Sequence, residues 1–139
     1  SRRARCANEA IDGVRMEGHG QATGGDVAHR VIRSRSQDFR PLLKPASFDL
    51  IYIDGTLYYA DARRDMKEAK RLLRPDGLIC GDDLDAQPTP ALIALARQNL
   101  DRDLLVLPDG SAFHPGVMLA VVEEFATVES ENGFWWVRP

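Results

Sequence analysis

The chain has 139 residues, of which 44% are hydrophobic and 28% are charged, and its formal net charge is −3. This length and composition are typical of one globular domain and exclude wholesale disorder. The acidic balance gives no support to a nucleic-acid partner, and no apolar run approaches the roughly 20 residues that a membrane span needs. We therefore expect a single domain over residues 1–139, with residues 1–30 irregular, and neither a nucleic-acid nor a membrane partner.

The two cysteines, Cys6 and Cys80, are too few for a disulfide framework or a four-cysteine zinc site. The basic start of the chain, residues 1–5, is not followed by the apolar core of a signal peptide. These two features favour a reducing, cytoplasmic location.

The elements are taken in chain order. Residues 2–11 suggest a short helix, and five glycines between positions 13 and 25 indicate loop. Patterns of β-forming residues predict strands at residues 30–33, 48–54, 78–83, 104–107, 126–129 and 134–137. Helical spacing and Pro or Asp start signals predict helices at residues 37–43, 62–73, 91–99 and 115–125.

Two of these elements carry specific expectations. The strand over residues 48–54 is nearly continuous in apolar residues, which is typical of a strand buried on both faces. Asp61 is expected to cap the helix that follows it, and residues 74–77 read as a turn before the next strand.

The alternation of strands and helices predicts an α/β fold with a Rossmann-like, mainly parallel sheet and flanking helices. Asn132-Gly133 between two short strands predicts a C-terminal antiparallel hairpin. Residues 85–115 interrupt the alternation and are expected to form an insertion.

Three acidic residues follow two consecutive strands of the predicted sheet. Asp54 ends one strand, and Asp82 and Asp83 end the next. In open α/β sheets, ligands bind outside the carboxyl ends of the strands. If the strands are neighbours, the three carboxylates meet there, and oxygen ligands favour a hard divalent cation such as Mg²⁺. The competing interpretation is that these residues only start loops.

Residues 47–55, residues 72–79 and the triplet Gly81-Asp82-Asp83 resemble the class I S-adenosylmethionine-dependent methyltransferases. The nearest branch is the metal-dependent O-methyltransferases, typified by catechol O-methyltransferase. The resemblance implies S-adenosylmethionine as cofactor, with Ser36 and Gln37 beside its adenine and Asp54 at the cofactor. It also implies that Asp54, Asp82 and Asp83 hold Mg²⁺ or another hard divalent cation.

The chain departs from that family in two places. The glycine-rich loop after the family's first strand and the ribose-binding acid after its second strand have no clear counterpart in residues 1–30, so the methyltransferase fold looks incomplete. Leu57 occupies a position where the family often has a Lys or His that acts as general base. Tyr58, Tyr59 and His114 are candidate substitutes, and nothing in the sequence selects one.

The expected function is methyl transfer from S-adenosylmethionine to a hydroxyl of a small molecule, assisted by a metal. Either this chain or a longer chain that contains it would carry out this reaction, and the insertion over residues 85–115 is expected to border the acceptor site. An alternative is a truncated or degenerate methyltransferase fold that serves as a non-catalytic binding or assembly module. A phosphatase of the haloacid-dehalogenase type is disfavoured, because Tyr52 stands where that family needs an aspartate nucleophile.

The strand over residues 48–54 lacks the neighbour that the family's strand order gives it. An unpaired apolar strand is a template for association. Three outcomes are open: residues 1–30 fill the gap, two chains pair as a homodimer through the exposed sheet edge, or the chain is a fragment, which the sequence favours.

Overall fold

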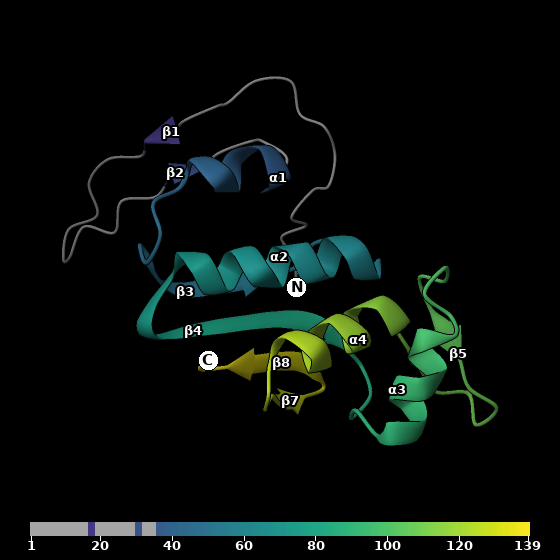
Figure 1. Cartoon of the computed structure of the whole chain (residues 1–139). Helices are drawn as coiled ribbons and strands as arrows, with labels where there is room; N and C mark the ends of the chain where they lie inside the picture. Colours follow the sequence, from purple (N-terminus) through teal and green to yellow (C-terminus); the bar gives the residue numbers. More distant parts are fainter. Residues whose placement is uncertain (1–16, 19–29, 32–35) are drawn as a thin grey trace.

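The computed structural model describes residues 17–18, 30–31 and 36–139. The predicted helix over residues 2–11 lies outside these described residues, as do the glycines at positions 13, 20, 24 and 25. The main element is a four-stranded sheet in the order β3-β4-β8-β7 (Figure 1). The α/β fold class and the C-terminal antiparallel hairpin predicted from the sequence are confirmed.

Strands β3 (Phe48–Ile53) and β4 (Leu73–Leu84) run parallel, with Ile51 opposite Ile79 and Ile53 opposite Gly81. The predicted turn over residues 74–77 is absorbed into β4 as an irregularity in this pairing, and Asp76 adopts a positive φ of 64° there. Strand β4 therefore begins five residues earlier than the sequence predicts.

The C-terminal hairpin joins β7 (Glu129–Glu131) to β8 (Gly133–Val137), and β8 pairs antiparallel with β4. Asn132 and Gly133 have φ values of 52° and 86°, the left-handed conformation that a tight hairpin turn requires. Strand β7 begins at Glu129, so the strand predicted over residues 126–129 is wrong in position.

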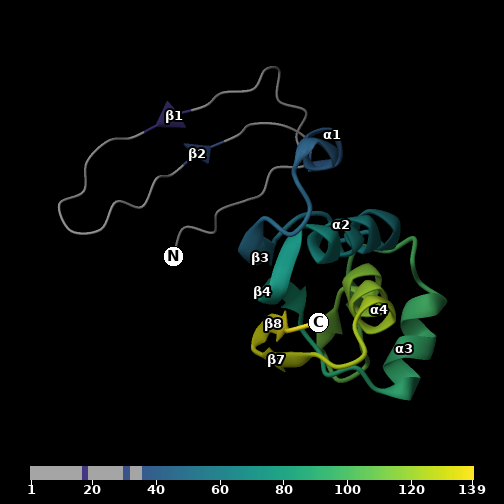
Figure 2. The same ribbon diagram turned by 60° about the vertical axis from the view of Figure 1, so that its left-hand side comes forward.

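Helices α2 (Tyr59–Leu72) and α4 (Pro115–Glu124) pack on one face of the sheet, with α3 (Pro90–Arg97) beyond α4 (Figure 2). The core lies between these helices and the sheet. Its largest fully buried members are Trp135, Phe113, Met66, Ile79, Met118 and Val121. Helix α2 begins three residues before the predicted start. Asp61 consequently lies in its first turn and pairs with Arg64, and the predicted cap at Asp61 is wrong.

The opposite face of the sheet is open within the described part of the chain. Leu50 and Tyr52 on β3 are 57% and 44% exposed, so the expectation that this strand is buried on both faces is wrong for the described residues. The Tyr52 and Phe134 rings lie 6.3 Å apart and the Phe134 and Trp136 rings 5.9 Å apart, measured between centroids. We call the surface formed by Leu50, Tyr52, Phe134 and Trp136 the open face.

The remaining elements are short. Helices α1 (Ser36–Phe39) and η1 (Arg40–Leu42) confirm the predicted helical turns at residues 37–43. Strands β1 (Glu17–Gly18) and β2 (Arg30–Val31) pair antiparallel, as do β5 (Leu105–Val106) and β6 (Ala112–Phe113). Among the described helices, none has the length and apolar character needed to cross a membrane.

Candidate functional site at the carboxyl edge of β3 and β4

The three predicted carboxylates meet at one edge of the sheet. Ile53 and Gly81 are register partners, so Asp54 and Asp82 follow at the carboxyl ends of neighbouring parallel strands. Asp54, Asp82 and Asp83 line the same small cavity, together with Gly55, Thr56 and Leu57 from the segment after β3. The cavity holds about 10 Å³, room for no more than one water molecule. The structure thus brings together the residues that the sequence picked out.

The end of β4 is held in a defined shape, which we call the acidic turn (residues 82–85). The Asp83 backbone N–H donates to Asp82 Oδ1 at 3.0 Å, and Asp83 has a positive φ of 69°. The Trp135 indole N–H donates to the Asp82 carbonyl oxygen at 3.2 Å. Gly133 lies so close that a Cβ there would be 3.1 Å from Asp85 Oδ1. Strand β8 therefore fixes where the acidic side chains leave the sheet.

The acidic turn brings several carboxylates close enough to affect one another's pKa. Burial raises the pKa of Asp83; the neighbouring His114 opposes this shift, and Asp82, Asp85 and Asp54 add to it. Burial also raises the pKa of Tyr52, and the charges of Asp54, Asp82 and Asp83 raise it further. Tyr52 is therefore a hydrogen-bond donor at neutral pH and a poor proton acceptor.

The segment between β3 and α2 is positioned by two contacts that the sequence did not reveal. The buried carboxylate of Asp65 on α2 pairs with Arg40 Nη1 at 2.5 Å, and a Cβ on Gly55 would lie 3.2 Å from Asp65 Oδ2. On the other side, a Cβ on Gly116 would lie 2.3 Å from the Leu57 carbonyl oxygen. The start of α4 can approach this segment only because residue 116 has no side chain.

Comparison with protein families gives one match. A family described as a methyltransferase domain matches residues 4–84, more than half of the chain. The chain belongs to this methyltransferase-domain family. Comparisons with curated proteins and with solved structures gave no match. The matched range of the methyltransferase domain includes β3, α2 and β4 with Asp54, Asp82 and Asp83, and it ends at Leu84, the last residue of β4.

The predicted metal site is not supported. Among the residues that the structure describes, no group of three or more His, Cys, Asp or Glu side chains is arranged so that it could hold a metal ion. Asp82 Oδ1 accepts a hydrogen bond from the Asp83 backbone N–H. The positive φ of Asp83 departs from the backbone conformation of a regular strand. The carboxylates share an edge of the sheet, but their arrangement does not fit Mg²⁺.

The tyrosines offered as proton acceptors differ in their surroundings. The Tyr59 hydroxyl donates to Glu123 Oε2 and accepts from Arg63 Nη1 at 3.0 Å, which commits it to the contact between α2 and α4. The hydrogen bond to Glu123 raises the pKa of Tyr59, with burial adding to the shift. Tyr58 is 51% exposed and precedes α2. Within the described part of the chain, neither tyrosine is held toward the carboxyl edge by a hydrogen bond of its hydroxyl.

His114, the third candidate, sits beside the acidic turn. It immediately precedes α4, and its ring nitrogens face carboxylates from two segments. Nδ1 is 2.7 Å from the Asp103 carbonyl oxygen and 3.3 Å from Asp103 Oδ1. Nε2 is 3.6 Å from Asp85 Oδ2. His114 could be selected from the sequence, but the positions of Asp85 and Asp103 beside its ring could not be predicted.

The residues proposed to contact adenine lie at α1. Ser36 begins this helix, and its side chain is outside the described part of the chain. Gln37 is exposed, and its Oε1 accepts from Arg64 Nη1 on α2 at 3.2 Å. This contact ties Gln37 to the helix that follows Asp54, but it leaves its role at a cofactor a prediction.

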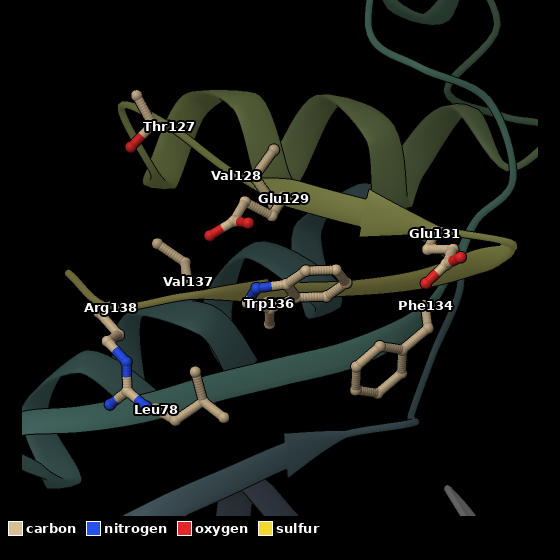
Figure 3. A pocket seen from close by; sticks show the side chains of 9 residues that line it. All are labelled: Leu78, Thr127, Val128, Glu129, Glu131, Phe134, Trp136, Val137 and Arg138. Carbon is tan, nitrogen blue, oxygen red and sulfur yellow. The ribbon is translucent and has the colours of Figure 1, made fainter.

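A larger cavity lies away from this edge. It has a volume of about 650 Å³ and is formed mainly by β7, β8 and Leu78 of β4 (Figure 3). Trp136 and Phe134 contribute aromatic surface, and Glu129 and Glu131 line it from β7. The acidic turn does not contribute to this cavity.

Proposed function

We propose that this methyltransferase domain transfers a methyl group from S-adenosylmethionine to a hydroxyl oxygen of a small molecule, at the carboxyl edge of β3 and β4. The family supports methyl transfer in general and S-adenosylmethionine as the methyl donor. The observation that carries the choice of site is the convergence of Asp54, Asp82 and Asp83 on one cavity at neighbouring strand ends.

The chemistry of this edge suits such a cofactor. Within the described residues, no Lys or Arg pairs with Asp54, Asp82 or Asp83, so their negative charge is available to a ligand. S-Adenosylmethionine supplies an electrophilic methyl group on a cationic sulfur. A half-buried carboxylate such as Asp54 can accept hydrogen bonds from a ligand's hydroxyl or ammonium groups, and it favours a positive charge nearby.

This site can raise the rate of methyl transfer by positioning the two reactants. Holding the acceptor oxygen in line with the methyl group replaces a collision in solution with a step inside one complex. The 10 Å³ cavity is far too small to enclose a nucleoside, so the described edge supplies one wall of the cofactor site. In this proposal the insertion over residues 85–115 borders the acceptor.

The direct test is turnover. The chain is incubated with S-adenosylmethionine that carries a radiolabelled methyl group and with catechol as the probe acceptor, and labelled product and S-adenosylhomocysteine are measured. We expect both products in equal amounts, and we expect Asp54→Asn to lower the yield at least tenfold. Asp49→Asn, an exposed substitution near the start of β3 and away from the carboxyl edge, serves as the control and should leave the yield unchanged. Equal yields from Asp54→Asn and wild type would contradict the assignment.

One observation favours the alternative of a non-catalytic module. The open face presents Leu50, Tyr52 and Phe134 to solvent in the described part of the chain, and exposed apolar surface of this kind is typical of interaction sites. A module would associate with a partner without consuming S-adenosylmethionine. Pairing of two copies through β3, the outer strand of the four-stranded sheet, stays a prediction that light scattering can test.

A further inference from the structure

The imidazole of His114 is held in one orientation by its contacts to Asp103. A carbonyl oxygen can only accept a hydrogen bond, so Nδ1, at 2.7 Å from the Asp103 carbonyl oxygen, must carry the proton. The Asp103 carboxylate oxygen at 3.3 Å from Nδ1 is also an acceptor. In the neutral ring the lone pair is then on Nε2.

Nε2 faces Asp85 of the acidic turn. It lies 3.6 Å from Asp85 Oδ2, beyond hydrogen-bond distance, and within the described residues no hydrogen-bond donor contacts it. The side chain of His114 is 14% exposed, so Nε2 is shielded without being sealed from a ligand. Asp85 in turn lies against Gly133, close to Asp82.

Carboxylates surround this ring. Asp83 and Asp85 face it from the acidic turn, and Asp103 faces it from the segment after α3. His114 is close enough to affect Asp83, because it counteracts the rise in the pKa of Asp83 that burial causes. A ring with a fixed tautomer, a free nitrogen and neighbouring carboxylates has the features of a general base.

From this geometry we propose that His114 accepts the proton of the acceptor hydroxyl through Nε2, a role that rests on the proposed function. Leu57, Tyr58 and Tyr59 do not offer this combination. The Leu57 side chain has no proton-accepting atom, and the Tyr59 hydroxyl is hydrogen-bonded to Glu123. The Tyr58 hydroxyl makes no orienting hydrogen bond with the residues that the structure describes.

The step balances without any further reactant. The O–H bond of the acceptor breaks and its proton moves to Nε2, while an electron pair of that oxygen forms the new bond to the methyl carbon. The carbon–sulfur bond breaks, and its electron pair stays on sulfur, which leaves neutral S-adenosylhomocysteine. The imidazolium then returns its proton to solvent, and Asp103 keeps Nδ1 protonated throughout.

The first test does not depend on activity. Long-range ¹H–¹⁵N spectra of the full chain at a pH where the ring is neutral report which nitrogen of His114 carries the proton. We expect a protonated Nδ1 and an unprotonated Nε2, and we expect the Nε2 signal to shift when catechol is added with S-adenosylhomocysteine. A ring protonated at Nε2, or a signal unaffected by the added probes, would overturn the assignment.

The second test separates this inference from the function on which it rests. His114→Gln should lower kcat for methylation of catechol by roughly 100-fold. It should also remove the ionisation that controls kcat in wild type, and leave S-adenosylmethionine affinity within about twofold. If wild type turns over and His114→Gln turns over equally well, His114 is not the base and the proposed function stands. If wild type neither binds S-adenosylmethionine nor methylates the probe, both are overturned. Asp49→Asn, an exposed substitution near the start of β3, is the control and should behave as wild type.

Discussion

The indole of Trp135 lies directly over Gly81. A Cβ at position 81 would lie 2.6 Å from two atoms of the indole and 2.7 Å from the Ile53 carbonyl oxygen. The same indole donates its N–H to the carbonyl oxygen of Asp82, the next residue along β4. One contact between a hairpin strand and a central strand therefore sets the spacing of the sheet and the start of the acidic turn.

Replacing Gly81 with alanine should be strongly destabilising. The new methyl group would collide with Trp135 and with backbone that cannot move independently of β3. We expect a loss of about 3 kcal/mol in the free energy of unfolding, at the upper end of what overpacking costs. Urea unfolding followed by tryptophan fluorescence measures this loss. Ala94→Gly, an exposed substitution in α3, is the control and should cost no more than about 1 kcal/mol. An unchanged midpoint for Gly81→Ala would show that the two strands are not this close.

The pair of Arg40 and Asp65 should matter more than a surface pair on the same helix. Asp65 is 6% exposed, so Asp65→Asn removes the partner of a largely buried guanidinium. We expect a loss of about 3 kcal/mol. Asp61→Asn, which breaks the exposed pair with Arg64 one turn earlier in α2, should cost less than about 1 kcal/mol. Equal losses for the two variants, measured by thermal and urea unfolding, would contradict the role assigned to Asp65.

Glu124 should make the stability of the fold depend on pH. Burial by itself raises the pKa of Glu124, but hydrogen bonds from Lys70 and Arg63, at 2.6 and 2.7 Å, outweigh burial and bring the pKa below its usual 4.5. A carboxyl whose pKa is lowered by folding stabilises the fold above its unfolded pKa, and this contribution disappears as the pH falls through the folded pKa. Glu124→Gln should therefore cost about 2 kcal/mol at pH 7 and progressively less below about pH 4.5. A loss that is the same at every pH would argue against these ion pairs.

Asp83 should show the opposite sign. Its pKa is raised by burial, with neighbouring carboxylates adding to the shift, so its ionisation opposes folding at neutral pH. Protonation as the pH falls removes that penalty. Asp83→Asn should consequently be more stable than wild type at pH 7, and the difference should shrink in acid. Asparagine tolerates the positive φ at this position, which keeps the comparison free of backbone strain. A destabilised Asp83→Asn variant at pH 7 would contradict this account.

Much of the fold could be predicted because the sequence patterns that specify it are local. The apolar run at residues 48–54, the Pro90 and Pro115 helix starts and the Asn132-Gly133 turn each occupy a few consecutive residues. The juxtaposition of Asp54 with Asp82 followed from one further step, the rule that consecutive parallel strands end at the same edge.

Other features depend on contacts between distant segments and left no local signal. Whether the second face of β3 is covered depends on what packs against it, so the apolar sequence alone could not decide the burial of Leu50. Asp65 did leave a trace, a carboxylate on the apolar face of an amphipathic helix, but its partner Arg40 comes from another element. The orientation of His114 by Asp103 depends on the path of the chain between α3 and α4, which local sequence patterns do not specify.

The most direct test of the central claim is an NMR titration of the full ¹⁵N-labelled chain with S-adenosylmethionine, with wild type compared with Asp54→Asn. The account predicts that the amide signals of Asp54, Gly55 and the acidic turn shift as the cofactor is added, and that these shifts are reduced at least tenfold at equal cofactor concentration in the variant. Signals at the carboxyl edge that stay unchanged, or shifts confined to the open face around Tyr52 and Phe134, would contradict a methyltransferase site at this edge.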